Sequence, residues 1–133
     1  MTAVLLDTSA YSALRRGHPE VVSQLGRSAR VCLNPIVLGE LHAGFRKGVR
    51  RGKNEQELEE FLESPRVDVL SVDEDTAERY AVIWHALREA GTPVPTNDLW
   101  ISATAMQHGL AVLTTDGHFL KVKQIVVRWV RSE

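Results

Sequence analysis

PTNDLWISATA, residues 95–105, is the stretch around which this sequence is organised, and Asp98 lies at its centre. The stretch opens on a proline, and Thr96 or Asn97 can cap a helix that begins there. With about 100° between successive helical residues, Asp98 shares its face with four apolar residues: Leu99, Ile101, Ala105 and Met106. A carboxylate on a buried face costs several kcal/mol unless a partner compensates it. Asp98 alone could equally be a first-turn acid favoured by the helix dipole, so its role depends on what the chain places beside it.

Length and composition are those of one ordinary globular domain spanning residues 1–133, with 44% hydrophobic and 25% charged residues. The formal charge of −1 gives no overall attraction to nucleic acid, so such a partner must be met by a local patch. A single cysteine, Cys32, within an apolar run is typical of a reducing compartment. The first apolar run, Ala3–Leu6, is too short for a signal peptide or a membrane span. We therefore expect a cytoplasmic protein without a membrane partner.

Two acids follow short apolar runs that have the pattern of buried strands. Ala3–Leu6 stops at Asp7, and Ala111–Leu113 runs through two threonines to Asp116. Taken singly, Asp7 is better explained as a helix cap and Asp116 as part of a turn. The functional alternative is a carboxylate at the carboxyl end of a strand, where open α/β sheets bind ligands. No Gly-x-Gly-x-x-Gly and no P-loop follows the first run, which excludes those nucleotide sites.

A third acid, Glu40, lies on the apolar side of a helix that begins at Asn34-Pro35, a strong start signal. Its stripe contains Ile36, Val37, Leu41, Gly44 and Phe45. A glutamate in that position is explained either by a buried salt bridge to an arginine or by a functional site.

The remaining pattern alternates strands and helices. Strands are expected at 30–33, 67–71 and 124–130, and helices at 9–15, 19–28 and from Asp73 to Gly91. The last helix is expected to bury Ala77, Tyr80, Ala81, Trp84 and Leu87. Alternation of this kind predicts an α/β fold with a mostly parallel sheet, whose strand ends all lie on one edge.

Four acids are thus directed toward one edge of the sheet: Asp7, Glu40, Asp98 and Asp116. Two carboxylates about 4 Å apart repel by roughly 4 kcal/mol at an effective dielectric near 20, so a cluster needs protons or a cation. Oxygen ligands favour a hard ion, Mg²⁺ or Mn²⁺. Zinc is disfavoured because there is no cysteine pair and the five histidines lack His-Glu-x-x-His spacing.

A basic segment follows the Glu40 helix and contains Arg46, Lys47, Arg50, Arg51 and Lys53. An acidic segment comes next, so both could form a solvated helical hairpin. The alternative is a rim that holds RNA phosphates on an extension of the Glu40 helix. No aromatic residue interleaves with the cations, so base stacking is not indicated there.

Four motifs together resemble the PIN domain, and the length and layout resemble the bacterial VapC toxins. They are Asp7-Thr-Ser, Glu40-Leu-x-x-Gly44, Asp98-x-x-Ile-Ser-Ala-x-Ala105 and Leu113-Thr114-x-Asp116-x-x-Phe119. The resemblance spans nearly the whole chain, with Ser102 where an alanine is common. It implies a three-layer fold with strand order 3-2-1-4-5. It also implies a Mg²⁺- or Mn²⁺-dependent endoribonuclease, usually a homodimer, that a cognate antitoxin silences.

Carried over by position, the resemblance makes Asp7, Glu40, Asp98 and Asp116 the catalytic and metal-binding quartet, with Ser9 and Thr114 as polar supports. We expect a metal-activated water to hydrolyse RNA, with Arg46, Lys47, Arg50 and Arg51 as possible RNA contacts. None of the residues named in these motifs is a histidine, so a metal-free ribonuclease based on histidine is not indicated. Two alternatives stay open at this level: a PIN-like module that binds RNA or protein without cutting, and another Mg²⁺-dependent phosphodiesterase or DNA nuclease. The absence of an Asp-x-Asp motif weakens a phosphatase.

Overall fold

A computed structural model describes residues 3–132. Its five strands form one parallel sheet in the order β3-β2-β1-β4-β5. The strands are β1 (Ala3–Leu6), β2 (Arg30–Leu33), β3 (Val67–Val69), β4 (Ala111–Thr114) and β5 (Val126–Trp129). The predicted α/β class and strand order are confirmed. β3 and β5 are each shorter than the sequence pattern indicated.

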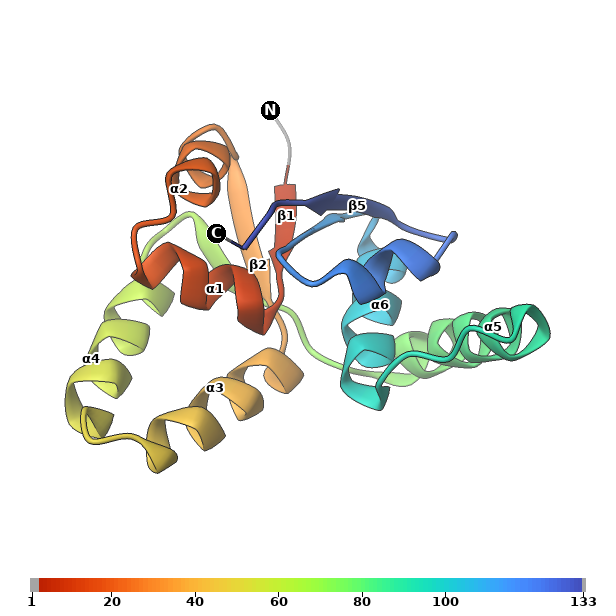
Figure 1. Cartoon of the computed structure of the whole chain (residues 1–133), viewed down its shortest axis with the longest axis horizontal. Helices are drawn as coiled ribbons and strands as arrows, with labels where there is room; N and C mark the ends of the chain where they lie inside the picture. Colours follow the sequence, from red (N-terminus) through yellow and green to blue (C-terminus); the bar gives the residue numbers. More distant parts are fainter. Residues whose placement is uncertain (1–2, 133) are drawn as a thin grey trace.

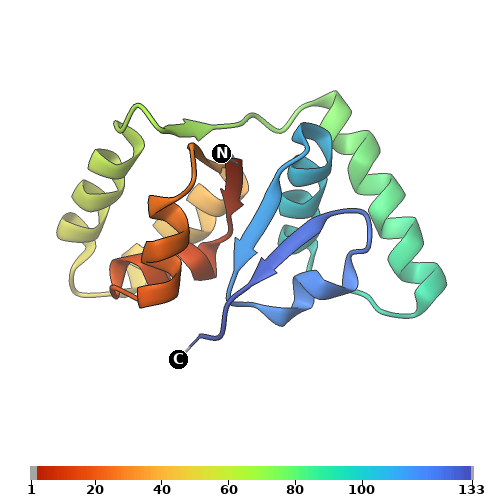
Figure 2. The same cartoon turned by 90° about the horizontal axis from the view of Figure 1, so that it is seen from above.

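Helices flank the sheet, with α1–α4 on one side of the molecule and α5 and α6 on the other (Figures 1 and 2). Their bounds are α1 (Thr8–Arg15), α2 (Pro19–Gly26), α3 (Pro35–Lys47), α4 (Arg51–Leu62), α5 (Glu74–Ala90) and α6 (Thr96–His108), and a short 3-10 helix, η1, spans Gly117–Lys121. In the part of the chain that the structure describes, no helix is both long and apolar enough to span a membrane.

α6 fixes the direction of Asp98 because the helix packs on both sides. Ile101 and Ala105 join the main core around β1, β2 and β4, whereas Leu99 and Ala103 join a second cluster with α5. The helix therefore has little freedom to rotate. Pro95 occupies the N-cap position without a side-chain cap bond, so the expected capping by Thr96 or Asn97 is wrong.

The predicted buried face of α5 is largely wrong. Ala77 and Ala81 are exposed, and Trp84 is 43% exposed, with the Arg88 guanidinium 4.9 Å from its ring centroid. The buried residues are Thr76, Ile83 and Leu87. α5 packs mainly on α6, so only a narrow stripe of this long helix is covered, and apolar residues beside that stripe remain in solvent.

Candidate active site

Asp7 and Thr114 lie side by side where β1 and β4 end, since the preceding residues, Leu6 and Leu113, are paired in the sheet. The Thr114 hydroxyl, fully buried, donates to Asp7 Oδ2 at 2.7 Å. The Ser9 hydroxyl lies 2.8 and 2.9 Å from the two Asp7 oxygens, and the Ala10 N–H donates to Oδ1 at 2.8 Å. Asp7 is also the N-cap of α1. Asp7 is therefore a helix cap and also lies close enough to Asp116 to interact with it electrostatically.

Burial dominates the electrostatics of Asp7, which is only 4% exposed. Desolvation raises the pKa of its carboxyl, and hydrogen bonds from Thr114, Ala10 and Ser9 offset part of that rise. Proximity to Asp116 raises the pKa further. The carboxylate is thus held in a fixed orientation, and a cation bound beside it would stabilise its ionised form.

Glu40 is half-buried and held by neutral partners. The Thr8 hydroxyl donates to Oε1, and the Asn97 amide donates to Oε2 at 2.9 Å. These two partners come from α1 and α6, so Glu40 on α3 is fixed from both sides of the site. The arginine partner considered from the sequence is replaced by a hydroxyl and an amide.

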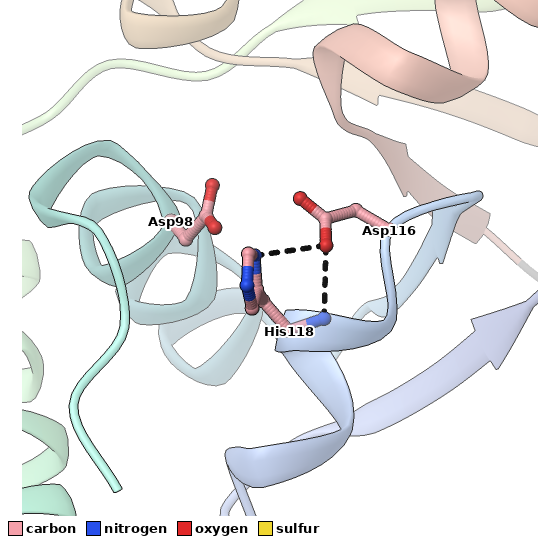
Figure 3. Close-up of side chains that lie close together, drawn as sticks. All are labelled: Asp98, Asp116 and His118. Carbon is pink, nitrogen blue, oxygen red and sulfur yellow. Dashed lines mark hydrogen bonds and ion pairs between the residues drawn. The ribbon is translucent and has the colours of Figure 1, made fainter.

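Asp98 and Asp116 face one another across the gap between α6 and η1, and the ring of His118 lies beside both (Figure 3). Their ligand atoms all lie within 4.8 Å of one another. His118 Nδ1 is 3.0 Å from Asp116 Oδ1, and the His118 N–H donates to the same oxygen at 2.9 Å. His118, which the sequence motifs did not single out, therefore lies beside two of the predicted acids. Asp116 is the sequence feature that could have indicated His118. An aspartate side chain often accepts the backbone N–H of the second residue after it, and this turn brings that residue back toward the aspartate.

Electrostatic repulsion links the four acids. The pKa of Asp98 is raised to about 6, by burial first and then by the carboxylates of Asp116, Asp7 and Glu40, in that order. Only His118 acts in the opposite direction. The structure therefore brings together Asp7, Glu40, Asp98 and Asp116, which the sequence had placed on four separate elements.

The donor set fits a divalent cation. Two carboxylates and an imidazole converge within about the span of one coordination shell. Burial and the neighbouring acids raise the pKa of Asp98, and a cation bound there would stabilise its ionised form. Ser9 and Thr114, which hydrogen-bond to Asp7, also bind the chain that leads to Asp116: Ser9 Oγ accepts the Thr115 N–H at 3.0 Å, and Thr114 Oγ1 accepts the Asp116 N–H at 2.8 Å.

Only the first part of the basic segment extends the Glu40 helix, and the later cations belong to the next helix, which corrects the sequence interpretation. Arg46 and Lys47 form the last turn of α3, Gly48 ends it in extended backbone, and Arg50 and Arg51 begin α4. All four are exposed. Arg51 lies 3.0 Å from Glu55, so part of its charge is already balanced.

Comparison with known proteins agrees with this geometry. Residues 4–125 match the family model of the PIN domain. The ribonuclease VapC4 of Mycobacterium tuberculosis is 34% identical over 92 residues, 69% of this chain and 71% of its own length. VapC5 of the same organism is 32% identical over 120 residues, 88% of this chain and 85% of its own.

A solved structure extends the likeness to the whole fold. It is described as a member of the VapBC family of toxin–antitoxin systems, VapBC-5, from Mycobacterium tuberculosis. It superposes with a TM-score of 0.75 at 28% identity and covers 98% of this chain and 100% of its own. The chain therefore belongs to the PIN-domain family, among the VapC ribonucleases of toxin–antitoxin systems.

Proposed function

We propose that this protein is an endoribonuclease that hydrolyses RNA phosphodiester bonds with a Mg²⁺ or Mn²⁺ ion held by the acidic quartet. The observation that carries the proposal is the raised pKa of Asp98 beside three further acids. Such a cluster is costly to a protein that leaves it empty. The relatives named as ribonucleases support RNA as the substrate.

Asp98 and Asp116 are the residues we assign to hold the ion. When bound, a divalent ion lowers the pKa of a water and neutralises charge that develops on the phosphate oxygens. Asp7 is kept in one orientation by Ser9 and Thr114. Glu40 keeps both oxygens occupied by Thr8 and Asn97, and its remaining lone pairs can orient the attacking water or complete the ligand set.

The basic residues Arg46, Lys47, Arg50 and Arg51 are assigned to the RNA backbone. Arg46 and Lys47 end α3, the helix that carries Glu40, and Arg50 and Arg51 lie at the start of α4 directly after it. Phosphate contacts from exposed cations supply affinity without sequence preference.

The test is cleavage of a pool of structured RNAs by purified protein with Mg²⁺, Mn²⁺ or EDTA, beside the Asp98→Asn variant prepared identically. We expect cutting that requires both the ion and Asp98. The variant controls for contaminating ribonuclease. Equal products from both proteins would overturn the proposal. RNA binding without cutting would point to a binding module, and cutting of DNA alone would point to a DNA nuclease.

We further propose an antitoxin partner and a homodimer. The antitoxin is supported by the VapBC-5 complex family named above, and a short reading frame directly upstream would encode it. Co-expression should yield a complex that no longer cuts RNA. Light scattering after size exclusion should give twice the chain mass of 14.8 kDa for the protein alone.

A further inference from the structure

We propose that the imidazole of His118 is a direct ligand of the bound ion and gives this site a preference for Mn²⁺ over Mg²⁺. The inference rests on the proposed metal centre and adds a residue that the acidic quartet lacks. Asp98, Asp116 and His118 form what we call the mixed-donor set, because it combines two carboxylates with a nitrogen.

Distances within the mixed-donor set match one coordination shell. Neighbouring ligands of an octahedral ion lie about 3 Å apart when each bond is about 2.1 Å long, and opposite ligands about 4.2 Å apart. His118 Nδ1 and Asp116 Oδ1 are 3.0 Å apart, as two neighbouring ligands would be. The ligand atoms of Asp98, Asp116 and His118 all lie within 4.8 Å of one another, close to the separation of opposite ligands.

The backbone holds His118 in place for this role. Its N–H donates to Asp116 Oδ1 at 2.9 Å, and the next residue, Phe119, is fully buried in the main core. The position of the ring is therefore set by a hydrogen bond on one side and an anchored side chain on the other. The ring itself remains half exposed, so an ion can reach it from solvent.

Charge also favours a neutral ligand here. The site already contains four carboxyl groups, Asp7, Glu40, Asp98 and Asp116, and the RNA phosphate brings more negative charge. An imidazole adds a donor without adding charge. Mg²⁺ prefers oxygen ligands and keeps its waters. Mn²⁺ also favours oxygen, but as a member of the divalent first-row series it binds sites that include nitrogen donors. A nitrogen ligand therefore strengthens binding of Mn²⁺ more than binding of Mg²⁺.

The competing role for His118 is that of a hydrogen-bond donor that only orients Asp116. His118→Asn separates the two roles, because an asparagine amide can occupy the place of Nδ1 and still donate to Asp116 but lacks the basic nitrogen. His85→Asn, on the exposed face of α5, is the matched control. Binding of Mn²⁺ and Mg²⁺ is measured by titration calorimetry on the full chain, and pulsed EPR of bound Mn²⁺ detects a directly bonded nitrogen.

We expect a nitrogen coupling in the wild type and in His85→Asn that disappears in His118→Asn. Loss of the ligand should weaken Mn²⁺ binding about tenfold or more and Mg²⁺ binding by less than about threefold. Bound Mn²⁺ without a nitrogen coupling would overturn the inference while leaving the metal centre intact, even if His118→Asn weakened the affinity. Failure of the wild type to bind Mn²⁺ better than Asp98→Asn would overturn the proposed metal centre as well.

Discussion

Asp98 is held in a protein environment that favours its neutral form. Its pKa rises from 3.8 to about 6 through burial first and the neighbouring acids second. Because the pKa of Asp98 is higher in the folded than in the unfolded chain, ionisation of this carboxyl costs stability, and the cost is absent at low pH. As pH increases from about 4 to 6, the unfolded chain releases this proton more readily than the folded chain, so stability falls across that window.

Asp98→Asn is therefore expected to raise the melting temperature of the metal-free protein at pH 7. After allowance for solvent screening, the gain is about 1 kcal/mol, or about 3–5 °C. The gain should vanish near pH 4, where the wild-type carboxyl is protonated. Calorimetric scans in EDTA at both pH values check this, and a variant that melts lower than the wild type at pH 7 would contradict the repulsion.

Ser102 and Thr104 make a matched pair on α6, four and six residues beyond Asp98. Both are fully buried. Within residues 3–132 the Ser102 hydroxyl has no hydrogen-bond partner, whereas Thr104 accepts from Asn34 at 2.9 Å and donates to the Trp100 carbonyl. Ser102→Ala should stabilise the fold by about 0.5–1 kcal/mol, and Thr104→Ala should destabilise it by about 1–3 kcal/mol. Urea denaturation of both variants measures the difference, and equal effects would contradict the assignment.

Asn97 is expected to act through Glu40. Asn97→Ala removes the 2.9 Å bond to Oε2, so Glu40 should lose its fixed orientation while Asp98 and Asp116 keep theirs. The expected result is about a tenfold lower turnover with nearly unchanged RNA affinity. Asn97 is exposed, so the melting temperature should change little. Single-turnover cleavage of one mapped RNA tests this, with Thr96→Ala as the neighbouring control; a change confined to affinity would place Asn97 in RNA binding instead.

At the scale of elements, the α3–α4 junction should govern salt dependence. Replacing both Arg46 and Lys47 with glutamine should weaken RNA binding across all sequences and reduce the slope of log affinity against log salt by about one for each lost contact. Arg51→Gln should have a smaller effect because Glu55 already balances it. Arg27→Gln, at the end of α2, is the control. An equal salt slope in all variants would show that the α3–α4 junction does not contact the RNA.

Different elements were predictable to different degrees. The strand ends carrying Asp7 and Asp116 were found because a short apolar run that stops at an acid is a local signal. The stripe of α5 was misplaced because Trp84 is apolar by type, while its burial depends on how much of the helix α6 covers. His118 was missed because a five-residue 3-10 helix has no apolar periodicity, and only the turn at Asp116 directs its ring inward.

For the whole molecule, metal binding and folding should be coupled. An ion that binds only the folded chain stabilises it by about 2.7 kcal/mol at a hundred times its dissociation constant. We therefore expect the wild-type melting temperature to rise with Mn²⁺ concentration and to fall again with EDTA, and Asp98→Asn to show neither response. A rise of the same size in the variant would place the stabilising ion elsewhere.

The order of the strands lies beyond what local patterns provide. Alternating elements predicted a parallel sheet, but any of several orders satisfies that alternation, and only the family resemblance selected 3-2-1-4-5. The observed pairing of β1 with both β2 and β4 places Asp7 next to Thr114. Local sequence patterns cannot predict this contact because the two residues are 107 positions apart.

That pairing also bears on how the protein is made. Asp7 is bonded to Thr114, 107 residues later in the chain, and Ser9 to the Thr115 N–H, 106 residues later. A ribosome that has delivered β1, the first five helices and even α6 has not yet delivered β4 or Asp116. The emerging polypeptide consequently cannot assemble the acidic quartet until β4 and Asp116 have been made.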